Sequence, residues 1–200
     1  MEDKNIFQND SGLKIDLGCG STKKNNFIGV DVNYYPGVDY TADLEEGLSF
    51  ISDNSVDEYF SSHFLEHVQN FEGLLKEIYR TIKPNGKIEI IVPHFSNPYY
   101  YSDYTHKRFF GLYTFDYFSS KKQQLKRKVP FYNSMVEFEV LERKLVFKSS
   151  FNLFLNLFRK HVFQRIFNST TYMQELYENL FSRLIPCSEI RFVLKPVKNN

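Results

Sequence analysis

The sequence predicts an α/β fold with a mostly parallel sheet, and three observations lead to this prediction. Short apolar runs alternate with turns over the first ninety residues, as expected of strands in a buried sheet. One segment between these runs has the apolar spacing of a helix. Because parallel neighbours need crossovers, this alternation is typical of a sheet whose ligands bind at the carboxyl ends of its strands.

Five strands and one long helix are expected before residue 93. The expected strands cover residues 13–17, 27–32, 38–42, 56–61 and 87–92. The expected helix carries apolar side chains at helical spacing from Val68 to Ile82. The turn Pro84-Asn85-Gly86 should end it, because proline and glycine break helices.

The second half of the chain predicts the other edge of the sheet. Residues 135–148 alternate like one long strand, residues 149–184 are helical in composition, and residues 189–197 alternate again. A strand, a helical insertion over 149–186 and a last strand should form an antiparallel pair at the sheet edge. No internal repeat or linker is evident, so residues 1–200 are expected to form one domain.

Composition and charge exclude several classes of protein. The 200 residues carry a formal net charge of +1, whereas nucleic-acid binders usually carry a basic excess, so no nucleic acid is expected. The polar start shows no secretory signal, and no apolar run reaches the ~20 residues that span a bilayer. The two cysteines, Cys19 and Cys187, form neither a disulfide framework nor a zinc-ligand spacing. A cytoplasmic protein is expected.

A glycine-rich bend follows the first expected strand. Gly18 and Gly20 lack a Cβ, which lets the backbone approach a ligand closely. Lys23 stands where a dinucleotide-binding loop would have its third glycine, and residues 21–26 leave room for one helical turn at most. The ligand therefore has no pyrophosphate to bind. The alternative is a plain turn between two core strands.

Three acids at strand ends indicate the charge of that ligand. Asp16 precedes the bend, where a carboxylate would repel a phosphate but attract an ammonium or sulfonium group. Asp31 ends the second strand and suits the hydroxyls of a ribose. Asp43 ends the third strand and could accept a hydrogen bond from an exocyclic amine such as that of adenine. Together these acids predict a cationic adenosine derivative.

Five motifs give the chain a resemblance to a known family. They are Asp16-Leu-Gly-Cys-Gly20, Gly29-Val-Asp31, Ala42-Asp43-Leu44, Phe64-Leu-Glu-His67 and Ile82-Lys-Pro-Asn-Gly86. From residue 13 to about residue 118 the chain resembles a class I S-adenosylmethionine-dependent methyltransferase, nearest to the small type-11-like group. The resemblance implies a Rossmann-like, seven-stranded sheet with an antiparallel last strand, S-adenosyl-L-methionine as cofactor, and S-adenosyl-L-homocysteine as product.

The resemblance also implies roles for individual residues. Gly18 and Gly20 would lie beside the methionine part of the cofactor, Asp31 at the ribose, and Asp43 with Leu44 at the adenine. The predicted cofactor-binding set is completed by Asp16, Cys19 and Ser62. The chain departs from the family pattern in its near-absent first helix, which some small members abbreviate.

The segment His63-Phe-Leu-Glu66-His67 allows a different interpretation. It matches the H-x-x-E-H signature of inverted zinc peptidases, in which both histidines lie on one helix face. The same residues fall where the methyltransferase resemblance expects Leu-Glu-His. His63 stands where relatives that bind a divalent ion would have an acid, so no metal is predicted. Glu66 and His67 are expected to cap or anchor the helix that follows.

Further polar residues follow the fifth expected strand. His63, His94, Asp103 and His106 could converge on one acceptor pocket at adjacent strand ends, and they form the predicted catalytic set. An oxygen acceptor must lose its proton, which suits a histidine of near-neutral pKa. His106 or His94 is the candidate base, and His63 should line the methyl group.

An aromatic segment over 93–130 is expected to cover the acceptor site. Its tyrosines and phenylalanines suit a sugar ring or another amphipathic acceptor, or else a lid that packs on the adenine and excludes water. A basic cluster, Lys121, Lys122, Lys126, Arg127 and Lys128, suits a solvated loop or the phosphate of an acceptor.

The apolar and basic helix over 152–167 leaves three alternatives open. It could contact an anionic membrane, seal the pocket as a cap, or form a homodimer contact.

The sequence therefore predicts a methyltransferase that acts on a small or glycan-type acceptor, at oxygen rather than nitrogen, with surface-polysaccharide biosynthesis as a setting. Two alternatives stay open. One is a catalytically silent protein that binds the same cofactor and regulates or scaffolds others. The other is the H-x-x-E-H zinc hydrolase.

Overall fold

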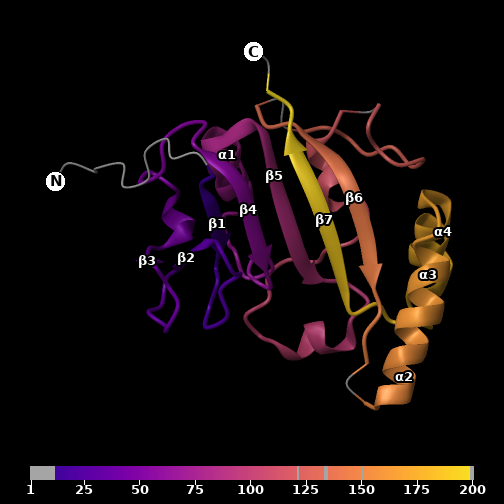
Figure 1. Cartoon of the computed structure of the whole chain (residues 1–200). Coiled ribbons are helices and arrows are strands. Elements are labelled where there is room, and N and C mark those ends of the chain that lie inside the picture. The colour runs from indigo at the N-terminus through magenta and orange to yellow at the C-terminus, as the bar shows by residue number, and fades with distance from the viewer. Residues whose placement is uncertain (1–11, 121, 133–134, 150, 199–200) are drawn as a thin grey trace.

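The computed structural model describes residues 12–120, 122–132, 135–149 and 151–198. Its centre is one sheet of seven strands in the order β3-β2-β1-β4-β5-β7-β6 (Figure 1). The strands are β1 (Lys14–Leu17), β2 (Ile28–Asp31), β3 (Tyr40–Thr41), β4 (Val56–Ser62), β5 (Ile82–Pro93), β6 (Phe138–Val146) and β7 (Glu189–Pro196). Neighbours from β3 to β5 are parallel, whereas β7 is antiparallel to both β5 and β6. This confirms the predicted mostly parallel sheet with an antiparallel last strand.

The helices are short, apart from α1. They are α1 (Phe71–Thr81), α2 (Leu153–Phe158), α3 (Gln164–Phe167) and α4 (Thr171–Leu176). Single turns complete them: η1 (Leu44–Glu46), η2 (Pro98–Ser102), η3 (Thr114–Phe118), and the π-helical η4 (Arg159–Phe163) and η5 (Tyr177–Phe181). Helices α2 to α4 run beside the edge strand β6 in Figure 1. The predicted insertion is therefore helical: residues 153–167 form one continuous run with a π-helical stretch, and residues 171–181 form a second run after a break at 168–170.

One face of the sheet is buried and the other is partly open. Alternate side chains from β1, β4, β5 and β7 form the core with α1 and the aromatic segment; they include Ile15, Tyr59, Ile90, Phe110, Phe115 and Phe192. The other face carries half-buried polar residues such as Glu58 and Glu89. Since both faces of a parallel sheet are usually covered by helices, the open face marks where a helix is missing.

The missing helix is the first one. Residues 18–27, all of which the structure describes, contain turns and no helix, as the sequence predicts. Lys24 occupies part of the helix's place. Its ammonium lies 4.0 Å from the centre of the Phe60 ring and pairs with Glu89 at 2.8 Å, while its backbone N–H donates to Asp16. A cation over an aromatic face and a carboxylate thus cover the sheet where the helix would lie.

The helix α1 begins later than its apolar spacing suggested. Val68 is buried but lies in the turn before α1, and Asn70 is the residue whose side chain caps the helix, by accepting from Gly73 N–H. Of the two alternatives for Glu66 and His67, that they cap this helix or anchor its start, capping is therefore wrong. At the other end Ile82 already belongs to β5, where it pairs with Val56, and the turn Pro84-Asn85-Gly86 lies within β5, beside an irregularity in this pairing.

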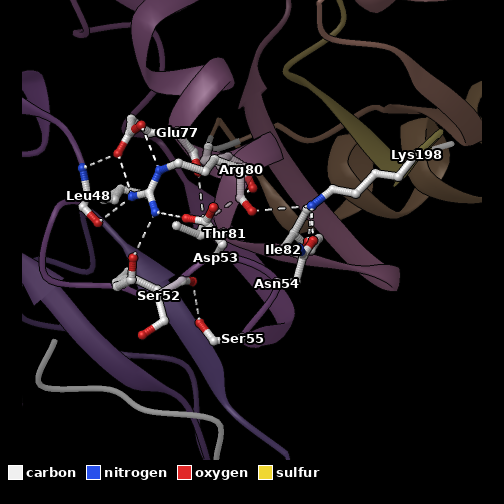
Figure 2. A network of polar contacts seen from close by, with 12 residues as sticks. Leu48, Ser52, Asp53, Asn54, Ser55, Glu77, Arg80, Thr81, Ile82 and Lys198 are labelled. Carbon is white, nitrogen blue, oxygen red and sulfur yellow. Dashed lines mark hydrogen bonds and ion pairs between the residues drawn. The ribbon is translucent and has the colours of Figure 1, made fainter. Parts of the chain in front are cut away.

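Arg80 fixes the end of α1 to the loop before β4 (Figure 2). Its guanidinium donates to both carboxylate oxygens of Glu77, at 3.0 and 2.8 Å, and to the carbonyls of Leu48 and Ile51. Glu77 in turn accepts from Leu48 N–H at 3.0 Å. This bidentate arrangement holds the loop that leads into β4, whose carboxyl end forms part of the candidate site.

Candidate active site

The glycine bend is held by the end of the neighbouring strand β2. Gly18 N–H donates to the Val30 carbonyl at 2.9 Å, and Gly20 N–H donates to the Asp31 carboxylate at 2.9 Å. The other Asp31 oxygen accepts from Asn33 N–H at 2.9 Å. Both glycines have positive φ angles, +65° and +53°, which favour glycine. Asp31 therefore positions the bend that brings the backbone close to a ligand.

Beside this bend lies a cavity of about 430 Å³, which we call the glycine-bend cavity. Its lining includes Gly18, Gly20, Asp31, Asp43, Leu44, His63, Phe64, His67 and Val68. Five of these are predicted cofactor-binding residues: Gly18 and Gly20 after β1, Asp31 at the end of β2, and Asp43 and Leu44 at the start of η1. Asp43 caps η1 by accepting from Glu45 N–H, and Leu44 is buried. A lining that combines the acids Asp31 and Asp43 with apolar side chains suits an adenosine.

A second cavity, of about 500 Å³, opens on the partly exposed face of the sheet, and we call it the sheet-face cavity. It is lined by Asp16, Cys19, Thr22, Lys24, Phe60, Ser62, His63, Glu89 and Ile91. The remaining predicted cofactor residues, Asp16, Cys19 and Ser62, thus lie here rather than in the glycine-bend cavity. His63 lines both cavities, so the two sets meet at the end of β4.

Burial changes the acid–base properties of two residues in the sheet-face cavity. It raises the pKa of Asp16 to about 6, although the Lys24 N–H and the nearby lysines partly offset this. It also raises the pKa of the Cys19 thiol to about 11. Cys19 is therefore a neutral thiol at pH 7 and not a nucleophile.

His63 stands at the end of β4 with a left-handed backbone, φ +55°. Its two ring nitrogens each lie 3.4 Å from a carboxylate oxygen, Nε2 from Glu189 and Nδ1 from Glu66. These carboxylates, Glu189 first, raise the pKa of His63 to about 9. The imidazole is therefore charged at pH 7, and it cannot accept a proton there.

Glu66 lies at the centre of a group of histidines. Its side chain is 1% exposed, and its two oxygens accept no hydrogen bond from any residue that the structure describes. Around it lie His63, His67 and His106, and the rings of His67 and His106 are 4.8 Å apart. We call Glu66, His67 and His106 the Glu66 cluster. The sequence analysis assigned Glu66 and His67 a structural role at the start of the helix. Their place in the H-x-x-E-H segment was the one signal in the sequence that could have marked them as candidate site residues.

The predicted catalytic residues are partly brought together. His106 belongs to the Glu66 cluster, and Asp103 Oδ2 lies 3.5 Å from its Nε2. The Thr105 hydroxyl and N–H hold the pKa of Asp103 below its ordinary value. His94 lies elsewhere. It is fully buried, its Nδ1 is 2.8 Å from the Ser96 hydroxyl, and it lines neither cavity beside the glycine bend.

The H-x-x-E-H residues do not form the peptidase arrangement. That arrangement needs both histidines on one face of a helix, whereas His63 and His67 lie in the turn before α1. The structure therefore lacks the helix on which the zinc-hydrolase alternative depends, within the fully described segment 62–71.

The aromatic segment is divided between core and surface. Phe110 and Phe115 are buried and pack with Phe71 of α1, so they belong to the core. The exposed members are Tyr99, Tyr101, Tyr104 and Phe109. The segment is tied to the turn before α1, because Lys107 N–H donates to the Glu66 carbonyl at 2.8 Å.

A third cavity, of about 1110 Å³, lies between this segment and the helical insertion. Its lining includes Lys126 and Arg127 from the predicted basic cluster, together with Arg183, Glu175 and Glu178, and none of the predicted site residues. Lys121 of that cluster lies outside the described residues.

Comparisons with known proteins agree with this geometry. Residues 15–90 match the family model of a methyltransferase domain. Comparison with curated proteins gave no match. Among solved structures, an S-adenosylmethionine-dependent methyltransferase of Archaeoglobus fulgidus is 20% identical with a TM-score of 0.53, covering 94% of this chain and 88% of its own. The YcgJ protein of Bacillus subtilis is 12% identical with a TM-score of 0.54, covering 97% and 95%.

A third solved structure contains S-adenosylhomocysteine, which is what remains of S-adenosylmethionine after it has given up its methyl group. It is a phosphoethanolamine N-methyltransferase of Haemonchus contortus, in complex with phosphomonomethylethanolamine and S-adenosylhomocysteine. It is 16% identical with a TM-score of 0.50, covering 94% of this chain and 49% of its own. At these identities the solved structures inform on the fold. The matched domain, the fold and the glycine bend together define a class I S-adenosylmethionine-dependent methyltransferase, with S-adenosylmethionine as its cofactor.

The two glycines of the bend give a matched pair of substitutions. A Cβ on Gly18 would overlap the Phe64 ring, whereas a Cβ on Gly20 meets nothing within 4 Å. Both variants carry the cost of a left-handed alanine, about 1–2 kcal/mol, and overlap adds about 1–3 kcal/mol. We expect Gly18→Ala to lower the free energy of unfolding in urea by roughly 2–5 kcal/mol and Gly20→Ala by about 1–2 kcal/mol. Equal losses would show that Phe64 does not pack on the bend.

Proposed function

We propose that this methyltransferase moves the methyl group to an oxygen of a small or glycan-type acceptor at the Glu66 cluster. The observation that supports this most directly is the position of the cluster, because His67 lines the glycine-bend cavity and the ring of His106 lies 4.8 Å from the ring of His67. The exposed tyrosines of the aromatic segment suit a sugar ring. Surface-polysaccharide biosynthesis is the setting that we propose for such an acceptor.

The proposed cofactor contacts follow the two cavities. Asp31 would accept from the ribose hydroxyls, and Asp43 with Leu44 would contact the adenine in the glycine-bend cavity, which also exposes Gly18 and Gly20. The methionine end would pass His63 into the sheet-face cavity, where Asp16 attracts its ammonium beside Cys19 and Ser62. Residues 13–92 would thus form the cofactor half and residues 93–130 the acceptor side, within one domain.

His106 is the proposed base of this reaction. Its Nδ1 lies 2.9 Å from the Tyr100 carbonyl, which can only accept, so Nδ1 donates, and Nε2, which lies 3.5 Å from Asp103 Oδ2, is the nitrogen that would take the proton. When bound, S-adenosylmethionine supplies an activated methyl, whose carbon–sulfur bond breaks with its electrons passing to sulfur as the carbon–oxygen bond forms. The acceptor's proton passes to His106 Nε2. His63 is charged at pH 7 and would instead line the methyl group.

His94 is no longer a candidate base in this proposal. Glu178 Oε2 lies 3.3 Å from its Nε2, and Phe95 and Tyr177 pack on its ring. These contacts suit a buried residue that joins the end of β5 to the helical insertion.

Two partners of the insertion remain as proposals. Phe151, Leu153 and Phe154 are 86%, 73% and 81% exposed, so they do not seal a pocket of this chain. The exposed apolar tip suits either a homodimer contact or an anionic membrane surface. No described helix is long and apolar enough to cross a membrane. Nucleic acid remains an unexpected partner on the charge balance of +1.

The catalytically silent alternative is separated from the enzyme by turnover. We expect S-adenosylhomocysteine to form when the chain is mixed with donor and a panel of sugars and other small alcohols. Loss of the base should lower kcat of His106→Ala about 10²–10⁴-fold, while the affinity for S-adenosylhomocysteine changes less than about twofold. His161→Ala, on the exposed face of the insertion, is the control. Equal loss of turnover and of affinity would reject His106 as the base.

Asp16 makes a prediction about pH. Because its folded pKa, about 6, exceeds its ordinary value of 3.8, its protonated form stabilises the free protein, and this stabilisation is lost as the pH rises through 6. A ligand ammonium favours the ionised form instead. We therefore expect calorimetry to give about tenfold tighter binding of S-adenosylhomocysteine at pH 7 than at pH 5.

Asp16→Asn is the matched variant, because its side chain keeps the shape of Asp16 but cannot ionise. It leaves in place Lys23, Lys24 and Asp31, the other charged groups that act on Asp16. Its affinity should be weaker than that of the wild type at pH 7, and nearly the same at both pH values. An unchanged pH dependence in Asp16→Asn would assign the effect to another group.

A further inference from the structure

The helical run that α2, η4 and α3 form together packs one of its sides on the domain. The rings of Phe163 and Phe167 lie 6.3 and 5.7 Å from the ring of Phe147, which follows β6. Arg159 donates to the Pro186 carbonyl. These contacts fix the rotation of the run about its axis, and the other side of the run faces outward.

This outward side changes in character along the run. The part that α2 forms, with the residue just before it, exposes apolar side chains, which we call the apolar tip: Phe151, Leu153, Phe154, Leu157 and Phe158. Lys160 and Arg165 are exposed further along the run. In Figure 1, α2 extends past the carboxyl ends of β4 and β5. An exposed apolar group of this size followed by cations is typical of an interaction surface.

The charge around the tip has one sign. The sequence contains no acid between Glu142 and Glu175. The acids of the insertion that follow are engaged with the aromatic segment, since Glu175 accepts from the Tyr113 hydroxyl at 2.9 Å and Glu178 accepts from Leu112 N–H at 2.7 Å. The run itself therefore offers cations and no carboxylate to a partner.

This charge separates the two partners that the tip could have. Lys160 and Arg165 form no ion pair within the described part of the chain. A two-fold dimer places the same surface of both copies against itself, so it would bring these cations together without an acid to balance them. The anionic lipids of a membrane surface supply the opposite charge.

We propose that the apolar tip enters the headgroup region of an anionic membrane, with Lys160 and Arg165 facing the lipid phosphates. Lys160 lies six residues after Phe154, which corresponds to about 9 Å along a helix. The apolar face of an interfacial helix reaches about 5–10 Å into the boundary between headgroups and acyl chains. The spacing along the run therefore brings the first cation to the phosphates when Phe154 reaches that depth.

This contact goes beyond the proposed function and does not depend on methyl transfer. Because α2 extends past the strand ends at which the candidate site lies, docking through the tip would turn that edge of the sheet toward the membrane (Figure 1).

The chain contains no tryptophan, so a single introduced indole reports on the tip directly. Phe154→Trp places it in the tip, and Tyr132→Trp places it on an exposed residue before β6 as a control. With vesicles of equal parts phosphatidylcholine and phosphatidylglycerol, the emission of Phe154→Trp should shift to shorter wavelength, because the indole leaves water. The emission of Tyr132→Trp should stay unchanged. An unshifted emission of Phe154→Trp would overturn the proposal.

Co-sedimentation of the full chain with the same vesicles measures the strength of the contact. Phe154→Ser should weaken binding about 10–100-fold, because the buried phenyl ring is lost. Lys160→Gln combined with Arg165→Gln should weaken it about 30-fold, since each cation near an anionic surface contributes about 1 kcal/mol. Lys76→Gln combined with Lys87→Gln removes the same charge from exposed lysines of α1 and β5, and it should bind as the wild type does.

Three results would contradict membrane docking. The first is a wild type that stays unbound in the presence of the anionic vesicles. The second is an equal loss of binding in the two double variants. The third is a dimer that Phe154→Ser dissociates, found by light scattering of a chain that does not bind the vesicles. These assays contain neither methyl donor nor acceptor, so their outcome is separate from that of the proposed function.

Discussion

The structure depends on the hydrogen bond between Gly20 N–H and the Asp31 carboxylate, which joins the ends of β1 and β2. In a Rossmann-like fold the glycine bend is normally followed by a helix, which fixes its position on the sheet. Here the bend continues through turns alone to β2. Its left-handed glycines are held by the Val30 carbonyl and by Asp31, both from the neighbouring strand. The proposed cofactor site is therefore built from strand ends, and the residue proposed for the ribose also shapes the bend.

The proposed acceptor side is built on the end of β4 in a similar way. His63 N–H donates to the Ile91 carbonyl at 2.9 Å, and the chain then turns in a left-handed conformation before α1. The aromatic segment is attached to this turn, since Lys107 N–H donates to the Glu66 carbonyl and Arg108 to the carbonyl of Val68. One turn therefore positions Glu66 and His67 and also the segment that carries His106. The relative position of the proposed cofactor and acceptor sites follows from the two adjacent strands β1 and β4.

Much of this architecture could be predicted from local patterns. Apolar runs and glycine turns predicted the strands, and the shortness of residues 21–26 predicted the missing helix, because both depend on residues close in sequence. The helix α1 begins at Phe71 rather than near Val68, since a buried turn residue and a helical residue share the same spacing. The insertion breaks at Asn168 and Thr170, where Asn168 contacts Leu145 of β6 and Thr170 caps α4.

The site was less predictable, because burial and long-range partners decide it. Nothing near His94 in the sequence indicates that Glu178, in the insertion, lies against its ring. The Glu66 carboxylate looked like a helix-capping group, and only the folded chain buries it among histidines. Asp16 points to the open face of the sheet, which the sequence could not reveal without the strand register. The acids at β2 and η1 were predictable because the carboxyl ends of parallel strands share one edge.

The central claim, that Asp31 selects an adenosine cofactor while it holds the glycine bend, is tested most directly by calorimetry of Asp31→Asn with S-adenosylhomocysteine. The amide keeps the shape of the side chain but loses the charge that strengthens its hydrogen bonds. Hydrogen bonds to charged groups contribute about 1.5–3 kcal/mol, so Kd should rise roughly 10–150-fold. Asp57 lies near the start of β4, at the end of the strand away from the candidate site, so Asp57→Asn should leave Kd unchanged. An affinity of Asp31→Asn within twofold of the wild type would contradict the account.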